Sequence, residues 1–358
     1  MKRIIISVTN DLTGDRRVLK VAHTLYNNGY EVLLIGRKLK NSPPLNLPFK
    51  YKRLRLLFKR SVFFYMAFNL RLFFVLLFSK ADVFLSNDTD TLLANYLASK
   101  IRRKKLVFDA HECFPEVPEL THRPKVKRVW EKIENWIFPH LTSCYTVCDS
   151  IADYYNKKYQ INMKVVRNVP HYTQPFEKKL LSYSDKKVII YQGALNIGRG
   201  LEWIIDAMPL INNAVLVIIG DGDIAGELQT RATDMKLTGK VFFLGRIAGA
   251  ELHKYTPSAN LGLCLLENKG LNYYFSLPNR IFDYVHARVP VLATDFPEIN
   301  NIVTQYKTGI LVNHYEPEYL AEVINDFFAK EFDTNHFEDI AKQFCWENEE
   351  KILMQIIS

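Results

Sequence analysis

The stretch KVIIYQGALNIGRGLEWIIDAMPLINNAVLVIIG, residues 187–220, holds two continuous apolar runs on either side of an amphipathic segment. The runs KVIIYQ and AVLVIIG are short and rich in β-branched residues, which is typical of strands buried on both faces. The segment between them, GLEWIIDAMPLI, has the length and periodicity of a helix. A strand, a helix and a second strand in this order predict a parallel sheet with helices packed against it.

The same alternation extends over the chain in two blocks. The strands expected in the first block are RIIISV, EVLLIGR, ADVFLSN, KLVFDA and SCYTVC, and those in the second block also include KVFFLG, NLGLCLL and VPVLAT. Residues 166–186 contain prolines but no periodicity, which indicates an interdomain linker. The sequence therefore predicts an α/β protein with one domain over 1–168, a second over 169–335, and a C-terminal helix over 336–358. Ligands bind beyond the carboxyl ends of parallel strands, so the two sheets are expected to face each other across a cleft.

Composition restricts the class of protein and its surroundings. The 358 residues are 48% apolar and 24% charged, as in a globular protein of two domains, and the five cysteines match no metal or redox spacing. We therefore expect a reduced, cytoplasmic setting. Through Arg167 the chain has 30 Lys and Arg against 14 Asp and Glu, and thereafter 17 against 24. This asymmetry indicates that the first domain faces an anionic partner.

The partner is expected to be a membrane surface, because the basic residues 50–60 run directly into the aromatic, apolar segment 61–78. That segment carries Asn69 and Arg71 and is short for a spanning helix. It suits a helix lying in the membrane interface, with its apolar side chains at the acyl boundary. A helix buried against the sheet is the alternative. No recognition helix or stacking pattern indicates nucleic acid.

The segment SLPNRIFDYVHARVPVLATD, residues 276–295, predicts a binding site. Pro278 begins a helix that Ser276 is expected to cap, and the first-turn amides of such a helix favour a phosphate. Asp283 lies five residues further, ~7.5 Å along the helix axis. This separation suits a nucleoside diphosphate, whose ribose hydroxyls the carboxylate would accept. A solvent-facing acid is the alternative. The glycines of LVIIGDGDIAGE do not have the spacing of a dinucleotide fingerprint.

With these motifs in place, the chain resembles family 4 glycosyltransferases, the retaining enzymes of the GT-B fold. The resemblance runs from NGYEVLLIG through VVRNVP, IIYQGALNIGRGLEWIIDAM, LVIIGDGD and KVFFLGRI to the segment above and FCWENEE at the end. DRRVLKVA and FDAHE are similar to bacterial members that build surface polysaccharides. The resemblance implies two Rossmann-like domains and transfer of a sugar from UDP- or GDP-sugar to an acceptor, without metal or other cofactor. A lipid-linked acceptor at the cytoplasmic membrane face is expected, because the basic, aromatic segment belongs to the acceptor domain.

The resemblance also implies roles for individual residues. Arg199 is expected to stabilise the leaving diphosphate, and His111 is expected near the transferred sugar, a structural histidine being the alternative. The residues expected to bind the donor are Gly14, Arg17, Arg246, Pro278, Asn279, Arg280 and Asp283. Where the family usually has a glutamate and a basic residue, this chain has Phe275 and Ala194. Arg280 is the candidate substitute cation.

Two alternative functions follow from these departures and from the fold. One is a nucleotide-sugar epimerase, and the other is a nucleotide-sugar-binding protein without activity. No metal site is expected: Asp88 and Asp90 spell DTD, but Asp88 is expected to cap a helix.

Overall fold

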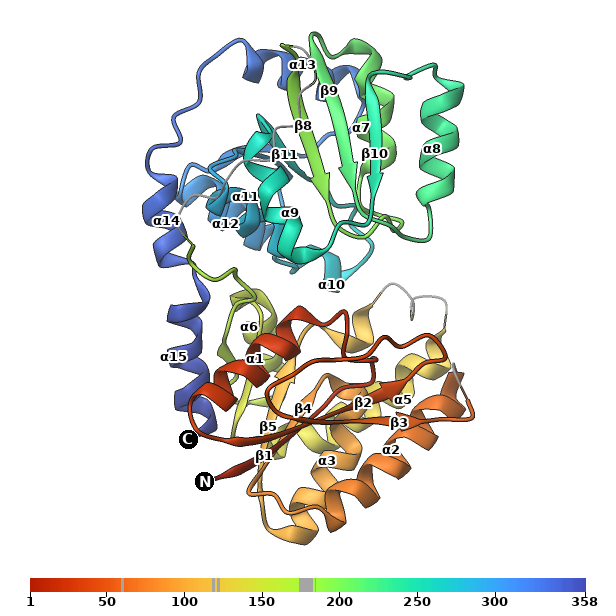
Figure 1. Ribbon diagram of the computed structural model, residues 1–358, viewed down its shortest axis with the longest axis vertical. Coiled ribbons are helices and arrows are strands. Elements are labelled where there is room, and N and C mark those ends of the chain that lie inside the picture. Colours follow the sequence, from red (N-terminus) through yellow and green to blue (C-terminus); the bar gives the residue numbers. More distant parts are fainter. Residues whose placement is uncertain (59–60, 118–119, 121–122, 174–182, 184) are drawn as a thin grey trace. The chain divides into compact units, whose positions relative to one another are not determined.

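The computed structural model describes residues 1–58, 61–117, 120, 123–173, 183 and 185–358 (Figure 1). The chain forms two compact units, one of residues 1–168 with 349–358 and the other of residues 169–348. Most of the expected linker, residues 174–182 and 184, lies outside the described part of the chain. Each unit is a parallel sheet with helices on it, so the predicted α/β fold of two Rossmann-like domains is confirmed.

The first unit is built on a seven-stranded parallel sheet in the order β3-β2-β1-β4-β5-β6-β7. Its strands are β1 (Arg3–Ser7), β2 (Glu31–Lys38), β3 (Lys50–Arg55), β4 (Val83–Asn87), β5 (Lys105–Ala110), β6 (Cys144–Thr146) and β7 (Lys164–Val165). The central strands are apolar because helices cover both of their faces. The order reverses between β1 and β4, so the loops after these strands diverge at the carboxyl edge.

The helices of the first unit lie on both faces of this sheet. In the described part of the chain they include α1 (Arg16–Asn27), α2 (Ser61–Phe78), α3 (Thr89–Arg102), α5 (Pro124–Ile137) and α6 (Asp149–Tyr159). Helices α2, α3 and α5 follow one another along one side (Figure 1). Helix α1 also contacts the end of the chain, where Thr24 donates a hydrogen bond to Glu350.

Helix α2 has two apolar faces with different surroundings. Phe64, Phe68, Leu72 and Leu76 recur every four residues and pack in the core beside the strands. The opposite face is exposed and includes Phe63, Met66, Leu70, Phe74 and Phe78. By length and composition this 18-residue helix could cross a membrane, with a mean hydropathy of 1.9. Its buried face fits the alternative of a helix packed against the sheet. Its exposed apolar face is what a helix in the membrane interface would require.

The second unit is a six-stranded parallel sheet in the order β10-β9-β8-β11-β12-β13. Its strands are β8 (Lys187–Gln192), β9 (Ala214–Ile219), β10 (Val241–Gly245), β11 (Leu261–Cys264), β12 (Val291–Thr294) and β13 (Gly309–Val312). Its helices before the C-terminal pair are α7 (Leu201–Ala207), α8 (Ala225–Asp234), α9 (Gly249–Tyr255), α10 (Leu271–Tyr274), α11 (Asn279–His286), α12 (Pro297–Gln305) and α13 (Pro317–Phe328). The stretch 187–220 forms β8, α7 and β9, as the sequence predicts.

The chain ends in two helices where the sequence suggested one over 336–358. Helix α14 (Phe337–Gln343) belongs to the second unit, and α15 (Trp346–Ile357) enters the first unit from Glu349 onward. The two are separated at Phe344, whose backbone leaves the helical region. Lys105 holds the last turn of α15 by donating hydrogen bonds to the carbonyls of Ile356 and Ile357.

Candidate functional site

The predicted donor site lies at the carboxyl edge of the second sheet, where the strand order reverses between β8 and β11. In parallel sheets this reversal leaves a crevice between diverging loops. The loop 193–200 follows β8, and α11 begins 15 residues after β11 ends. Arg199 therefore comes from one side of the reversal and Arg280 from the other.

Glycines let the loops at this edge approach closely. Gly220 has φ of +155°, and a Cβ there would lie 1.8 Å from the carbonyl oxygen of Gly193. Gly193 in turn donates its backbone N–H to Ile219, at 3.0 Å. The first residues after β8 and β9 thus pack against each other without side chains, and the edge stays open to a ligand.

Arg280 is a buried cation in the first turn of α11. It is 8% exposed, and its guanidinium carbon lies 4.5 Å from the centre of the Tyr191 ring. Its Nη1 has no hydrogen-bond partner among the described residues. An arginine stays charged at any physiological pH, and leaving one of its buried donors unpaired costs free energy. An anion at Nη1 would remove that cost.

Arg199 is a second cation near the same place. Its guanidinium carbon lies 5.1 Å from the centre of the Tyr273 ring, and its buried Nε is without a hydrogen-bond partner in the described part of the chain. Burial raises the pKa of the Cys264 thiol, and the charges of Arg280 and Arg199 both oppose this rise. The two guanidinium groups therefore lie near one thiol at the end of β11. Two cations with unpaired donors fit a diphosphate.

The start of α11 differs from the sequence prediction in its cap. Pro278 occupies the N-cap position, but no side chain caps the helix. Ser276, the expected cap, donates its hydroxyl to the carbonyl of Tyr273 instead. Asn279 is the exposed first residue of the helix. With Asn279 as its first residue, helix α11 still has its first-turn amides at the site, as an anion-binding helix end requires.

Asp283 is held by a short polar chain. The Gln192 amide donates to Asp283 Oδ2 at 3.1 Å, and Gln192 Oε1 accepts the Thr256 hydroxyl at 2.7 Å. The Thr256 bond fixes which end of the Gln192 amide faces the carboxylate. The structure thus orients Asp283 at the end of β8, one turn beyond Arg280. Its contact with a ribose stays a prediction.

His111 lies at the corresponding edge of the first sheet, just after β5, between two carboxylates. Its Nδ1 is 3.3 Å from Asp88 Oδ2, and its Nε2 is 3.3 Å from Asp109 Oδ2. Burial alone would lower the pKa of His111, but these carboxylates raise it to about 10. The charge of Asp109, whose own pKa is lowered, favours the imidazolium form of His111. Burial raises the pKa of Asp88 to about 8, so Asp88 contributes less of this charge near neutral pH. Both of its ring nitrogens already have partners, so a contact with substrate would replace one of them.

Asp88 does not cap α3 with its side chain, contrary to the expectation. It stands at the N-cap position with φ of 56°, but its Oδ1 accepts the backbone N–H of His111 at 2.8 Å. A non-glycine residue in this backbone region is strained, and such strain concentrates at functional sites. Nearby, Thr9 donates to Asp90 at 2.6 Å, and burial raises the pKa of Asp90 to about 7.

Arg17 lies in the interior of the first unit, which gives its predicted ligand contact no geometric support. Its Nε and Nη2 donate to Asp109 at 3.0 and 2.8 Å, and its Nη1 donates to the carbonyl of Val166. Burial alone would raise the pKa of Asp109, but Arg17 and His111 lower it to about 2. Arg17 thus neutralises the carboxylate that holds His111.

The remaining predicted residues are Gly14 and Arg246. A Cβ at Gly14 would meet no atom within 4 Å, so a side chain would fit there. Arg246 follows β10 and is exposed. The structure brings together Arg199, Pro278, Asn279, Arg280 and Asp283 in the second unit, whereas Gly14, Arg17 and His111 belong to the first.

Sequence reasoning missed Gln192, Tyr191 and Asp109, which position the predicted residues. Each lies at or near the carboxyl end of a strand, and polar residues there were the signal that could have found two of them. Within the described ranges, no group of three His, Cys, Asp or Glu side chains is placed to hold a metal ion.

Comparison with known families divides the chain in the same way as the structure. Residues 14–171 match the model for Glycosyltransferase Family 4, and residues 173–344 match that for Glycosyl transferases group 1. An uncharacterized glycosyltransferase of Methanocaldococcus jannaschii is 27% identical over 48% of this chain and 45% of its own. The alpha-monoglucosyldiacylglycerol synthase of Streptococcus pneumoniae is 30% identical over 38% of this chain and 29% of its own. The chain spans less than half the length of these curated relatives.

Solved structures share the whole fold at low identity. Anabaena HepE in complex with UDP and glucose has a TM-score of 0.75 at 16% identity, covering 100% of this chain and 99% of its own. Sucrose-phosphate synthase from Thermosynechococcus elongatus has a TM-score of 0.78 at 15% identity, with coverage of 100% and 98%. Two parallel-sheet domains and two adjoining family matches lead to one conclusion: the chain is a GT-B-type glycosyltransferase like those of group 1 and family 4.

Proposed function

We propose that this protein is a retaining glycosyltransferase that moves a hexose from UDP- or GDP-sugar to a lipid-linked saccharide at the cytoplasmic membrane face, in the synthesis of surface polysaccharide. The observation that carries the proposal is the pair of cations at one sheet edge, Arg199 and Arg280, whose enclosed nitrogens lack partners among the described residues. A buried donor without a partner costs stability, so we infer a ligand that pairs these two nitrogens.

The two guanidinium groups would stabilise the leaving group. Cleavage of the bond between sugar and phosphate leaves negative charge on the diphosphate, and fixed cations beside it lower the barrier. In the proposed reaction the acceptor hydroxyl attacks from the face that the diphosphate leaves, and a diphosphate oxygen takes the hydroxyl proton. We expect no metal, because Arg199, Arg280 and the first-turn amides of α11 would carry the electrostatic role.

Asp283 and His111 would have separate roles, each in its own domain. Gln192 presents Asp283 in one orientation, which suits acceptance of two ribose hydroxyls. His111 would act as a fixed positive group, because Asp109, whose pKa is lowered, lies against its ring and favours the protonated form. In this role it stabilises charge and orients a sugar hydroxyl, and it removes no proton.

The lipid-linked acceptor rests on different support. One relative is named for a glucosylated diacylglycerol, and a Candida albicans relative is named chitobiosyldiphosphodolichol beta-mannosyltransferase, 23% identical over 40% of this chain. The exposed apolar face of α2 and the basic strand β3 before it would suit an anionic bilayer. We place the protein on the membrane as a peripheral protein on these grounds.

An epimerase is a second candidate, because a putative UDP-N-acetylglucosamine 2-epimerase from Listeria monocytogenes has the same fold, with a TM-score of 0.66 at 12% identity. A binding protein without activity is a third, suggested by Phe275 and Ala194 at positions that are usually charged in the family. An epimerase would convert the donor in the absence of acceptor and membranes, and a binding protein would leave it intact.

The proposal is tested by a thermal-shift screen with UDP-, GDP-, ADP- and CDP-sugars. Binding to the folded state stabilises it by RT ln(1 + [L]/Kd), which is ~2.7 kcal/mol at a hundredfold excess over Kd. We expect one nucleotide class to raise the melting temperature, and the matching free nucleoside diphosphate to do so as well. Absence of any shift with all four classes at millimolar concentration would contradict a nucleotide-sugar site.

A further inference from the structure

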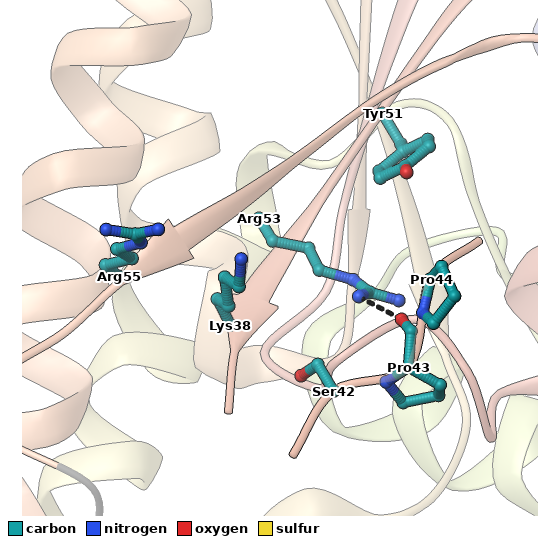
Figure 2. Close-up of a pocket in the computed structure, with 7 residues that line it drawn as sticks. All are labelled: Lys38, Ser42, Pro43, Pro44, Tyr51, Arg53 and Arg55. Atoms are coloured by element: carbon teal, nitrogen blue, oxygen red, sulfur yellow. Dashed lines mark hydrogen bonds between the residues drawn. The ribbon is translucent and has the colours of Figure 1, made fainter. Parts of the chain in front are cut away.

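An open pocket of about 510 Å³ lies at the outer edge of the first sheet, away from the residues discussed so far. Three cationic side chains line it, Lys38 from the end of β2 and Arg53 and Arg55 from β3, together with Ser42 and Tyr51. Figure 2 shows the Arg53 side chain beside Pro43 and Lys38, with Arg55 further along the strand. We call this the Arg53 pocket.

The strand pairing explains why the cations gather. Strands β2 and β3 run parallel, with Lys38 opposite Arg55. Side chains two residues apart on a strand point to the same face, so Arg53 and Arg55 share one face with Tyr51. Like charges at this spacing repel each other and stay hydrated unless an anion lies between them.

Arg53 presents two donors side by side in this pocket. Its Nη1 donates to the Pro43 carbonyl at 2.6 Å, which holds the guanidinium in place. Its enclosed Nε and Nη2 have no partner among the described residues. The same two nitrogens of Arg17 hold both oxygens of Asp109 at 3.0 and 2.8 Å. Arg53 therefore offers the edge that binds two oxygens of one anion.

The neighbouring acid does not neutralise the pocket. Burial would raise the pKa of Asp11, but hydrogen bonds from Thr13 and Ser42 and the charge of Arg53 lower it. Asp11 is therefore an anion that already accepts hydrogen bonds from both residues. Three cations against this one anion leave the pocket positive.

An exposed apolar surface begins where β3 ends, with α2 on the other face of the sheet from the pocket, because Leu54 packs beside α2 while Arg53 and Arg55 point the opposite way. Arg71 on α2 donates a hydrogen bond to the carbonyl of Arg55, which joins the helix to the end of β3. Leu57 and Phe58 follow β3 and are exposed, as is the outer face of α2 with Phe63 and Met66. Cations next to apolar and aromatic side chains are the arrangement of a surface that meets lipid headgroups and acyl chains together.

We propose that the Arg53 pocket binds the phosphodiester of an anionic membrane phospholipid, while the outer face of α2 enters the acyl boundary. The inference rests on the membrane part of the proposed function and names the lipid group that the enzyme holds. The pocket and His111 are four strand spacings apart along the sheet edge, ~19 Å. A phosphate attached to the reacting sugar would lie much nearer to His111, so the bound lipid docks the enzyme and is not the acceptor.

The test compares variants of equal charge on one strand. Arg53→Gln/Arg55→Gln removes two pocket cations, and Lys50→Gln/Lys52→Gln removes two from neighbouring positions on β3 that do not line the pocket. Binding to vesicles of phosphatidylglycerol and phosphatidylcholine is measured by co-sedimentation. General surface charge would cost both variants alike, ~5-fold per residue for the ~1 kcal/mol of each cation. We expect the Arg53/Arg55 variant to lose at least tenfold more than the control.

A second pair guards against misfolding, because Arg53 also holds Pro43. Lys38→Gln, in the pocket, is compared with Lys40→Gln, which is exposed two residues further on.

Soluble glycerophosphoglycerol, the headgroup without acyl chains, is expected to displace the wild type from vesicles at a concentration where inorganic phosphate at equal ionic strength does not.

The outcomes separate the inference from the proposed function. Equal losses in pocket and control variants, or equal displacement by inorganic phosphate, would overturn the phospholipid site while leaving donor binding untouched. Wild-type binding that ignores lipid charge would overturn the site together with the membrane part of the proposed function. Donor binding to UDP- or GDP-sugar is measured separately, and its failure would leave the vesicle result standing.

Discussion

Replacing Arg280 with methionine tests whether its buried charge serves a ligand. In the protein without ligand, the substitution removes a buried donor that lacks a partner in the described part of the chain, a cost of ~1–3 kcal/mol. It also removes the contact with Tyr191, worth ~0.5–2 kcal/mol. These contributions nearly cancel, and methionine fills most of the space, so we expect the stability of the ligand-free protein to change by no more than ~1 kcal/mol.

Binding of the nucleoside diphosphate should weaken strongly, although the stability of the ligand-free protein hardly changes. A hydrogen bond to a charged group contributes ~1.5–3 kcal/mol, so Arg280→Met should weaken binding of the nucleoside diphosphate by ~10- to 150-fold. Isothermal titration calorimetry with UDP and GDP measures the affinity, and thermal melting without ligand measures stability. Arg231→Met is the control that should leave affinity unchanged, because Arg231 is an exposed arginine of α8 that pairs with Asp206 on α7.

A structural role would give the reverse pattern. If Arg280→Met lowered the stability of the ligand-free protein by more than ~3 kcal/mol, and the folded remainder bound UDP or GDP as the wild type does, Arg280 would be a core residue. The anion site would then have lost its main support.

Three further predictions concern other candidate side chains. Asp283→Asn should weaken donor binding by ~1–3 kcal/mol, measured by calorimetry, and unchanged affinity would exclude the ribose contact. Arg199→Ala should lower kcat and kcat/KM together, whereas a change in KM alone would make it a binding residue. The raised pKa of His111, about 10, means that its charge stabilises the fold fully below the unfolded pKa of ~6.5 and that this stability is lost as the pH rises towards 10. Thermal melting between pH 6 and pH 10 should therefore fall more steeply for the wild type than for His111→Asn, and parallel curves would show that the imidazolium is absent.

The fold could be predicted from the sequence because strands buried on both faces leave a continuous apolar signature. The runs that became β8 and β9 lie within a residue of their expected bounds. The break between α14 and α15 was missed, because the apolar spacing continues through Phe344 and Cys345 while the backbone departs from the helix. Both residues are buried at that corner, which satisfies the pattern without a continuous helix.

The sequence predicts on which elements the candidate residues lie, but it does not predict their hydrogen-bond partners. Arg17 and Asp109 are 92 residues apart in sequence, and nothing in the pattern around either shows that they pair. Arg17 was therefore expected at a ligand. Ser276 and Asp88 precede helices as capping residues do, yet each side chain bonds another group. A polar residue before a helix can form a capping hydrogen bond, but the tertiary fold decides whether its side chain forms that bond or a different one.

The central claim is that the protein breaks the bond between sugar and diphosphate with retention of configuration. Proton NMR of the protein with the UDP- or GDP-sugar that it binds tests this most directly, because it observes the anomeric proton of each species. Without acceptor we predict slow release of free sugar that first appears in the anomeric form of the donor, and loss of this release in Arg199→Ala. First appearance of the opposite anomer would contradict the retaining mechanism, a new sugar nucleotide without release would indicate an epimerase, and an unchanged donor would indicate a binding protein.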